Sequence, residues 1–461
     1  MTLRFGTDGV RGVANRDLTP ELVTALGRVA ARVLGARQWI VGRDTRRSGP
    51  LLEAALVAGL CAEGADVVSV GVLPTPGVAY LSQADGAPAA MISASHNPFP
   101  DNGIKLFAPG GRKIPDDTER RIEHLLAALT AEGDGDGLDR GPDRHAADGE
   151  DVGVWRRADD ASQRYVDHLT GALDGRTLER LHVVVDCGNG AASTVAPAAL
   201  RALGARVTAL NDTPDGTNIN AACGSTDPSA LQRAVVAEHA DAGLAFDGDA
   251  DRVIAIDERG TIVDGDQVLA ILALDLAQQG GLRHGALAAT VMSNLGLRRA
   301  LREQGIELVE TAVGDRNVLV AMEEHDLALG GEQSGHVILA DHATTGDGTL
   351  TGIVLLDVAR RAARPLSELA AVMTRLPQVL RNVRVSDKSI LDGAAATAVR
   401  DAIGDVEREL GGDGRVLVRV SGTEPVVRVM VEATTEARAR QCADRLVDAV
   451  TGLDRGSLRG I

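Results

Sequence analysis

Hydrophobic and polar positions along the chain follow two alternating patterns. Short runs rich in Val, Ile and Ala are separated by longer alanine-rich stretches with the spacing of amphipathic helices. Strands that alternate with helices in this way predict βαβ units on a mainly parallel sheet. The runs expected to form strands are residues 39–41, 67–70, 90–93, 183–186, 207–210, 243–246, 253–256, 288–292 and 308–311.

A junction of helix, glycine and strand recurs three times, at residues 64–67, 204–207 and 305–308. The recurrence favours three comparable α/β units, although any α/β protein contains junctions of this kind. Residues 131–150 are rich in Gly and Asp and show no periodicity. This composition predicts an exposed loop that closes the first unit.

The end of the chain has a different pattern. Residues 415–420 and 426–432 alternate strictly between apolar and polar positions, so each run predicts a strand with one buried face. A helix is expected at 435–450. Together these elements predict an antiparallel α+β module rather than another βαβ unit.

The expected fold class is therefore α/β, with three similar mixed α/β domains followed by a smaller C-terminal α+β domain. With 461 residues, and roughly 100–200 residues per domain, three or four domains are expected. The expected domains are residues 1–150, 151–251, 252–366 and 367–461.

Charge and composition exclude several classes of partner. The formal net charge of −17 at pH 7 repels nucleic-acid backbones and anionic membrane surfaces. Only four Phe, two Tyr and two Trp are available to stack on bases. No apolar run approaches the ~20 residues of a membrane span. Nucleic acid and membranes are therefore not expected as partners.

The compartment is predicted from the first residues and the cysteines. The start of the chain lacks the apolar core of a secretion signal. The four cysteines are far apart and show no CxxC spacing, so neither a zinc site nor a disulfide framework is indicated. A cytoplasmic location fits these features.

Three carboxylates alternate in a loop at the end of an expected strand. They are Asp247, Asp249 and Asp251 of the sequence DGDADR. Oxygen ligands of this kind suit a hard divalent cation. An EF-hand is excluded because its sixth position, which must be glycine, is Arg252. A solvated acidic turn is the alternative, but crowded carboxylates repel one another without a cation, which favours a metal site.

A second polar loop follows the expected strand 90–93. It contains Ser95 and His96 in the sequence SASHNP, with Lys105 shortly after. Sites in α/β proteins collect at this edge of the sheet. No G-x-S-x-G elbow is present, so a capped polar turn is an equal alternative from these residues alone. The chain has only three lysines, which favours a specific role for Lys105.

The sequence RVSGTEPVVR, between the two last expected strands, suits a phosphate group. Its small residues can offer backbone N–H groups and two hydroxyls, and its arginines can bind an anion through two hydrogen bonds each. A plain hairpin loop with surface arginines is the alternative. The candidate phosphate ligands are Arg419, Ser421, Gly422, Thr423 and Arg428.

Two further glycine-rich segments carry candidate side chains. GGEQSGH contains Glu332, Ser334 and His336, which can contact hydroxyl or amino groups of a small ligand. His336 is the weaker candidate, because a lone histidine is more often structural. FGTDGVRG contains Arg11, and its glycine spacing fits no dinucleotide fingerprint.

These five segments, in their order along the chain, resemble the α-D-phosphohexomutase family, and within it the glucosamine-specific bacterial members. The order is FGTDGVRG, SASHNP, DGDADR, GGEQSGH and RVSGTEPVVR. They span residues 5–428 and so cover essentially the whole chain. Each segment is modestly specific alone, and the set is highly specific. The resemblance implies four domains around a central cleft, in agreement with the expectation above. Ala250 of DGDADR departs from the family, which usually has glycine there.

The resemblance also implies catalytic roles. Ser95 would carry the transferred phosphoryl group, with His96 beside it, and Lys105 and Arg11 would take part in acid–base catalysis. The metal implied is Mg²⁺. Its expected ligands are Asp247, Asp249, Asp251 and a phosphoserine oxygen of Ser95.

Further residues would bind the substrate. The sugar-reading loop is expected at GGEQSGH, and the cradle at RVSGTEPVVR would hold the phosphate that is not being transferred. Arg252 would support the phosphate on the serine. The residues expected to bind substrate are Glu332, Ser334, His336 and Arg252.

The implied activity is the interconversion of glucosamine 6-phosphate and glucosamine 1-phosphate through a phosphoserine enzyme and a 1,6-bisphosphate, in cell-wall precursor synthesis. The implied activator is glucosamine or glucose 1,6-bisphosphate. The implied partner is a phosphosugar substrate, and a homodimer is one possible oligomeric state. The alternatives are a phosphoglucomutase or phosphomannomutase of the same family, and a sugar-phosphate phosphatase. A silent binding protein is disfavoured, because the serine and the aspartates are all present.

Overall fold

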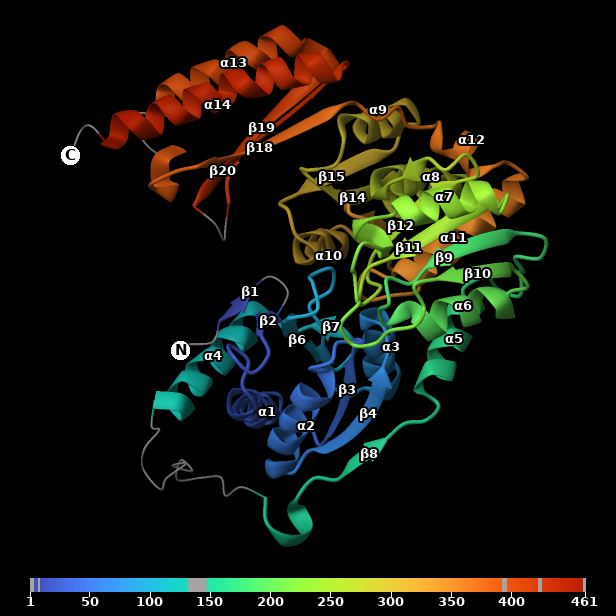
Figure 1. The fold of residues 1–461 in the computed structure, drawn as a ribbon, viewed down its shortest axis with the longest axis vertical. Helices are drawn as coiled ribbons and strands as arrows, with labels where there is room; N and C mark the ends of the chain where they lie inside the picture. Colours follow the sequence, from blue (N-terminus) through green and yellow to red (C-terminus); the bar gives the residue numbers. More distant parts are fainter. Residues whose placement is uncertain (1–3, 7–8, 132–146, 392–395, 422–424, 459–461) are drawn as a thin grey trace. The chain divides into compact units, whose positions relative to one another are not determined.

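The structure is a computed structural model that describes residues 4–6, 9–131, 147–391, 396–421 and 425–458. It divides into two compact units. The first contains Met1–Val291 and Ile306–Val372, and the second contains Met292–Gly305 and Met373–Ile461. The elements of each unit are labelled in Figure 1.

The first sheet of the first unit is mixed. Its strand order among the described residues is β1-β2-β6-β5-β3-β4-β8, and β7 pairs with β6. Strands β5, β3, β4 and β8 are parallel, whereas β6 joins β5 antiparallel. The strands are β1 (Phe5–Gly6), β2 (Gly9–Val13), β3 (Gln38–Arg43), β4 (Asp66–Val72), β5 (Ala89–Ile92), β6 (Asp101–Ala108), β7 (Arg112–Lys113) and β8 (Trp155–Arg157). The helices are α1 (Pro20–Leu34), α2 (Gly49–Ala62), α3 (Thr75–Asp85) and α4 (Asp116–Ala131).

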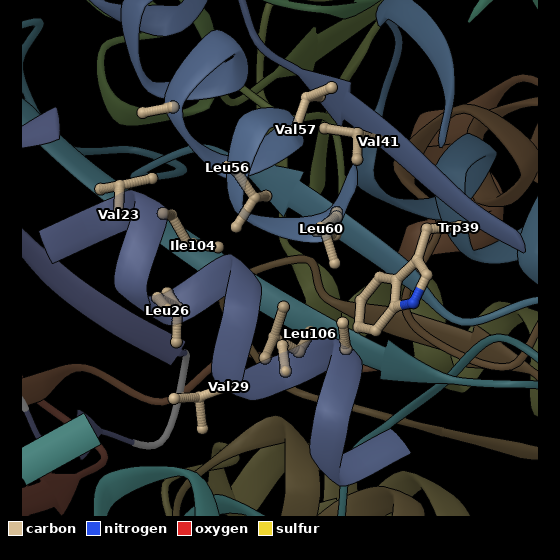
Figure 2. Packing of buried hydrophobic residues seen from close by; sticks show 14 of the residues in the cluster. Val23, Leu26, Val29, Trp39, Val41, Leu56, Val57, Leu60, Ile104 and Leu106 are labelled. Carbon is tan, nitrogen blue, oxygen red and sulfur yellow. The ribbon is translucent and has the colours of Figure 1, made fainter. Parts of the chain in front are cut away.

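Burial on both faces explains why strand β3 reads as a continuous apolar run. Trp39 and Val41 point to one face, where they join the core formed with α1 and α2 (Figure 2). Ile40 is equally buried and, by the alternation of a strand, faces the other side. Helix α1 begins where the Thr19 hydroxyl accepts a hydrogen bond from the backbone N–H of Leu22.

The second and third sheets repeat one arrangement. Their strand orders are β10-β9-β11-β12-β13 and β15-β14-β16-β17. In each, three parallel strands are followed by an antiparallel one, as in β4-β3-β5-β6 of the first sheet. The strands are β9 (His182–Asp186), β10 (Arg206–Leu210), β11 (Ala242–Phe246), β12 (Val253–Asp257), β13 (Ile262–Val263), β14 (Ala286–Thr290), β15 (Glu307–Thr311), β16 (Leu329–Gly331) and β17 (Val337–Leu339). The helices of these layers are α5 (Ala161–Gly171), α6 (Ala192–Ala202), α7 (Ser229–Ala237), α8 (Gly265–Gln279), α10 (Asp315–Glu324), α11 (Gly348–Ala362) and α12 (Leu366–Ala370).

The repeated arrangement places three motifs at equivalent positions. SASHNP lies between β5 and β6, DGDADR between β11 and β12, and the GEQSGH turn between β16 and β17. In each pair the motif connects the last parallel strand to the antiparallel strand that follows it. The three similar α/β layers predicted from the junctions are therefore present.

The second unit contains an antiparallel sheet with strand order β18-β20-β19. Helices α13 and α14 lie side by side over one of its faces (Figure 1). The buried carboxylate of Glu432 accepts hydrogen bonds from Arg415 and Asn294, which joins α9 to this sheet. The elements are α9 (Leu295–Glu303), β18 (Gln378–Arg384), α13 (Thr397–Leu410), β19 (Gly414–Val420), β20 (Val426–Ala433) and α14 (Glu436–Leu458).

The expected strands and C-terminal module are present with ends shifted by one or two residues, and α14 extends well past residue 450. Among the strands that were not expected are β6, β16 and β17. β6 begins with the polar Asp-Asn-Gly, β16 is Leu-Gly-Gly, and β17 is a run of only three apolar residues. Each pairs with a neighbouring strand, which stabilises the extended conformation. The loop predicted at 131–150 falls largely on 132–146, outside the described residues, and the four domain boundaries stay a prediction.

Close contact between α1 and α2 generates a stability prediction. A Cβ at Gly59 would lie 2.1 Å from the carbonyl oxygen of Thr24, and one at Gly27 would lie 2.4 Å from that of Leu56. We expect Gly59→Ala to lower the free energy of unfolding by about 1–3 kcal/mol, because the helices must separate. Urea-induced unfolding measures the change.

The matched control is Gly171→Ala on α5, where no described residue outside the backbone of the helix itself has an atom within 4 Å of the added methyl group. This variant is expected to be neutral or up to about 1 kcal/mol more stable, since alanine favours a helix over glycine. Equal effects of the two substitutions would contradict the packing explanation.

Candidate active site

The SASHNP loop begins where the fully buried strand β5 ends. Ser95 is 1% exposed and has a φ of 49°, in the left-handed region that costs free energy for a residue with a side chain. Its backbone N–H donates to the hydroxyl of Ser93 at 2.9 Å. Its own hydroxyl donates to Asp247 Oδ2 at 2.6 Å, although the two residues are 152 positions apart. The fold therefore brings the SASHNP loop and the DGDADR loop together.

The three carboxylates of DGDADR form one buried cluster. Asp247 and Asp249 are 0% exposed and Asp251 is 4% exposed. One oxygen from each lies within 4.8 Å of the others. Ala250 between them has a φ of 54°, so this position does require the conformation that favours the family's usual glycine.

Two side chains of the first α/β layer reach this cluster. Lys105 on β6 is 2% exposed, and its Nζ lies 3.0 Å from Asp249 Oδ2 and 3.5 Å from Asp251 Oδ2. The hydroxyl of Thr75, at the start of α3, donates to Asp249 Oδ2 at 2.6 Å. A buried ammonium next to two carboxylates offsets part of their charge.

Burial and neighbouring charges shift the pKa values of Asp247 and Asp251 in opposite directions. Burial, together with the charges of Asp251 and Asp249, raises the pKa of Asp247 well above its usual value. Burial opposes ionisation of Asp251 as well, but the ammonium of Lys105 holds the pKa of Asp251 well below its usual value. Burial also disfavours the charge on Arg252, yet Asp251 and Asp247 raise the pKa of its guanidinium. A cation bound at the cluster would favour the ionised form of Asp247, which burial and the neighbouring carboxylates oppose.

Two oxygens of the cluster suit a divalent cation. Asp249 Oδ1 and Asp251 Oδ1 are buried and have no hydrogen-bond partner within the described part of the chain. Buried acceptors without a donor are costly, so such atoms indicate a missing ligand. The atoms available to bind a metal here are carboxylate oxygens, which suit Mg²⁺ better than zinc or copper. The residues therefore fit the metal that the resemblance implies.

His96 and Arg252 lie beside Ser95. The Nδ1 atom of His96 is 3.4 Å from Ser95 Oγ and 3.1 Å from Arg252 Nη1. Partial loss of water around the ring, and the positive charges of Arg252 and Arg11, lower the pKa of His96. Arg11 lies on β2 opposite Gly103 of β6, and a Cβ at Gly103 would come within 2.8 Å of Arg11 Cδ. The FGTDGVRG segment, which contains Arg11, thus faces the same site.

The GEQSGH turn packs directly on the strand that follows DGDADR. A Cβ at Gly335 would lie 2.1 Å from the carbonyl oxygen of Val253, so this close approach requires glycine. Glu332 Oε1 accepts a hydrogen bond from the backbone N–H of Gly314 at 3.1 Å. Ser334 is exposed, as a residue that contacts a ligand can be.

His336 occupies a different environment from Ser334. It is 1% exposed, and its Nε2 accepts the backbone N–H of Gly346 at 3.1 Å. Nε2 therefore carries no proton, and the proton is on Nδ1, which lies 3.7 Å from Asp251 Oδ2. This placement favours support of Asp251, and the predicted contact of His336 with a sugar stays a prediction.

The predicted phosphate cradle lies in the second unit. Arg419 on β19 and Arg428 on β20 are directly opposite each other. Like charges in this arrangement repel, and burial together with Arg428 lowers the pKa of Arg419. The adjacent Ser421 is 3% exposed. An anion would relieve this repulsion. Gly422 and Thr423 lie outside the described residues.

Sequence reasoning missed several residues that hold the serine loop. Arg46 is 1% exposed and pairs with Asp44, and its guanidinium donates to the carbonyl oxygen of Ser95 at 2.9 Å. Asn220, from the second α/β layer, donates to the same oxygen at 2.9 Å. Charged residues directly after the buried run 39–41 could have indicated Asp44 and Arg46. No local pattern distinguishes Asn220.

Family models match almost the whole chain. All four domains of phosphoglucomutase/phosphomannomutase are found, with domain I at residues 2–132, domain II at 163–260, domain III at 264–376 and the C-terminal domain at 380–449. The chain belongs to the phosphoglucomutase/phosphomannomutase family. The predicted family and the α/β fold class are confirmed.

Individual members of this phosphohexomutase family are similar over their full length. A phosphoglucosamine mutase of Desulforudis audaxviator is 54% identical, covering 98% of each chain. The structure of a phosphoglucomutase/phosphomannomutase family protein from Burkholderia thailandensis has a TM-score of 0.79 at 26% identity, and covers 98% of this chain and 97% of that one.

A more distant structure shares the phosphohexomutase fold. Aspergillus fumigatus N-acetylphosphoglucosamine mutase, in complex with GlcNAc-6P and magnesium, has a TM-score of 0.71 at 19% identity and covers 98% of this chain and 96% of that one.

Within the described residues, no helix has both the length and the apolar character to cross a membrane. All four cysteines are described, and they are free thiols.

The cluster predicts that Mg²⁺ stabilises this phosphohexomutase. A cation that binds the folded chain raises its melting temperature, and Asp249→Asn removes one negative charge and replaces one of the two carboxylate oxygens with an amide NH2 group. We expect millimolar Mg²⁺ to raise the melting temperature of the wild type and to have a much smaller effect on Asp249→Asn. Thermal unfolding with and without Mg²⁺ tests this.

The control for the metal experiment is Asp212→Asn, an exposed aspartate outside the cluster. Its response to Mg²⁺ should equal that of the wild type. An equal response of Asp249→Asn would show that the cluster does not bind the ion.

Proposed function

We propose that this chain is a phosphoglucosamine mutase, which interconverts glucosamine 6-phosphate and glucosamine 1-phosphate through a phosphoserine at Ser95 and a 1,6-bisphosphate. The observation that carries the proposal is the 2.6 Å hydrogen bond from Ser95 Oγ to the buried carboxylate cluster. It brings the one expected nucleophile and the expected metal ligands into a single site. The 54% identity with a phosphoglucosamine mutase supports the choice of sugar.

The chemistry is two phosphoryl transfers of opposite direction. In the first, the bond from phosphorus to Ser95 Oγ breaks and a bond to the free sugar hydroxyl forms. The hydroxyl proton passes to a basic group and the serine oxygen takes up a proton. The bisphosphate then turns over in the site, and the reverse reaction returns its other phosphate to Ser95. No phosphate is consumed in the cycle.

Asp247, Asp249 and Asp251 would hold Mg²⁺ with a phosphoserine oxygen. When bound, the ion would offset negative charge on the phosphoryl oxygens as they are transferred. Arg252 would support the same phosphate, since its side chain lies between the carboxylates and His96. Lys105 would stabilise charge at the site through its ammonium group, and it is the candidate proton donor with Arg11.

Substrate recognition would involve both units. Glu332 and Ser334 would contact sugar hydroxyls, and the Gly314 hydrogen bond would keep the Glu332 carboxylate in place. The cradle of Arg419, Ser421, Gly422, Thr423 and Arg428 would bind the phosphate that is not transferred. Its opposed arginines are a site in which an anion is stabilised by two charges.

The remaining expectations follow from this activity. Glucosamine or glucose 1,6-bisphosphate would act as activator, because it phosphorylates Ser95 directly. A cytoplasmic location fits the four free thiols. A homodimer, and the absence of nucleic-acid and membrane partners, stay predictions.

The proposed activity is tested by phosphorus NMR with Mg²⁺, glucosamine 6-phosphate and catalytic glucose 1,6-bisphosphate. We expect the 1-phosphate resonance to grow with the wild type, and its rate to fall by at least about 10³-fold in Ser95→Ala, which lacks the phosphoryl acceptor. Ser389→Ala, at an exposed serine, should behave as wild type. Release of inorganic phosphate alone would identify a phosphatase. Faster turnover of glucose 6-phosphate would identify a phosphoglucomutase.

The cradle predicts a binding defect in Arg419→Gln. A hydrogen bond to a charged group contributes about 1.5–3 kcal/mol, so we expect the KM for glucosamine 6-phosphate to rise by roughly tenfold or more. Steady-state kinetics measures the change, with Arg440→Gln on the exposed face of α14 as control. An unchanged KM in Arg419→Gln would rule out the cradle.

A further inference from the structure

Two backbone carbonyls of the serine loop are each held by the same two side chains. The carbonyl oxygen of Ser95 accepts hydrogen bonds from Arg46 Nη2 at 2.9 Å and from Asn220 Nδ2 at 2.9 Å. The carbonyl oxygen of Asn97 accepts from the same two nitrogens, at 2.9 Å and 3.1 Å. His96 lies between these carbonyls. The orientation of both peptide groups next to the reacting serine is therefore restricted from two directions.

Arg46 is itself fixed within the first α/β layer. Its Nε donates to Asp44 Oδ2 at 2.8 Å, and Nη1 donates to the carbonyl oxygens of Pro98 and Asp101 at 2.5 Å and 3.0 Å. Asp44 Oδ2 also accepts the hydroxyl of Ser93 at 2.8 Å. This network belongs to the same layer as the serine loop, so it keeps the loop in shape but does not connect it to the carboxylates.

Asn220 makes that connection. It belongs to the second α/β layer, where its backbone N–H donates to the carbonyl oxygen of Gly188 at 2.9 Å. A Cβ at Gly248, inside DGDADR, would lie 2.6 Å from the carbonyl oxygen of Ser95 and 2.9 Å from Asn220 Nδ2. Asn220 therefore lies against both the serine loop and the metal loop.

The orientation of the Asn220 amide follows from its partners. Both groups that face the amide nitrogen are carbonyl oxygens, so a flipped amide would place an oxygen against two acceptors. The backbone of Asn220 has a φ of 56°, which asparagine and glycine tolerate better than other residues. Position 220 thus requires both a side-chain donor and a left-handed backbone, and asparagine satisfies both.

We propose that Asn220 is a positioning residue for phosphoryl transfer: its amide holds the Ser95 loop at a fixed distance from the carboxylate cluster. The inference rests on the proposed role of Ser95. Transfer requires reacting atoms aligned within about 0.5 Å, and Ser95 must regain one geometry after every half-reaction. Hydrogen bonds to the Ser95 and Asn97 carbonyls supply that constraint without contact with substrate.

Asn220→Gly tests the inference with the least disturbance of the backbone, since glycine accepts the left-handed φ. Asn220→Asp is the second variant, in which an acceptor replaces the donor opposite both carbonyls. Asn218→Ala is the matched control, because among the described residues the Asn218 side-chain amide forms hydrogen bonds to residues 213 and 215 of its own turn and to no others. Ser95→Ala is measured in parallel.

Two rates are measured on the full chain. One is steady-state conversion of glucosamine 6-phosphate, and the other is transfer of phosphate from glucose 1,6-bisphosphate to the unphosphorylated enzyme, followed by intact mass. We expect kcat to fall roughly tenfold in Asn220→Gly and further in Asn220→Asp, with the phosphorylation rate falling in parallel. KM should stay within about twofold of wild type, because Asn220 does not contact the sugar in this arrangement.

The outcomes separate the inference from the function it rests on. The inference is overturned if Asn220→Gly has wild-type kcat, if only KM changes, or if the loss of activity equals the loss of folded protein seen by thermal unfolding. If Asn220→Gly does not fold, the same comparison with Asn220→Asp decides. Activity retained in Ser95→Ala would instead overturn the proposed phosphoserine mechanism.

Discussion

Three aspartates buried within reach of one another are the constraint on which the first unit depends. Carboxylates in a low-dielectric interior repel strongly unless positive charge or hydrogen-bond donors face them. The fold supplies both from distant parts of the chain: Lys105 and Thr75 come from the first α/β layer, and Ser95 donates from the loop beside them. Two carboxylate oxygens of the cluster have no hydrogen-bond donor among the described residues, so the cluster that is costly for folding is also a place where a divalent cation would be stabilised.

Repetition of one strand arrangement explains how loops so far apart in sequence meet. Each α/β layer of the first unit ends its parallel strands with an antiparallel return, and the motif lies in that return. Close approach of the loops depends on glycines at their contacts. A Cβ at Gly248 would lie 2.6 Å from the carbonyl oxygen of Ser95, and one at Gly348 would lie 2.3 Å from that of Arg252. These positions have no room for a side chain, so the layers share one densely packed site.

Electrostatics of the two units differ in sign. The first unit concentrates buried carboxylates, whereas the second places Arg419 opposite Arg428 on neighbouring strands. Opposed arginines suit an anion such as a sugar phosphate, and the proposed phosphoryl transfer at Ser95 would require a cation next to the aspartates. The strong net negative charge of the chain does not argue against an anionic substrate, because the contacts that would bind it are local.

The sequence alone determined the fold class, the three similar layers, the C-terminal module and the motif segments, because periodicity and short motifs are local properties of the chain. It did not predict β16, whose Leu-Gly-Gly has no strand pattern, nor the burial of His336 against Asp251. Only the tertiary structure identified Arg46 and Asn220, because a hydrogen bond to a backbone carbonyl leaves no pattern at the acceptor's position. Ala250 shows the same limit: its φ of 54° is imposed by the packed loop and not by alanine's own preference.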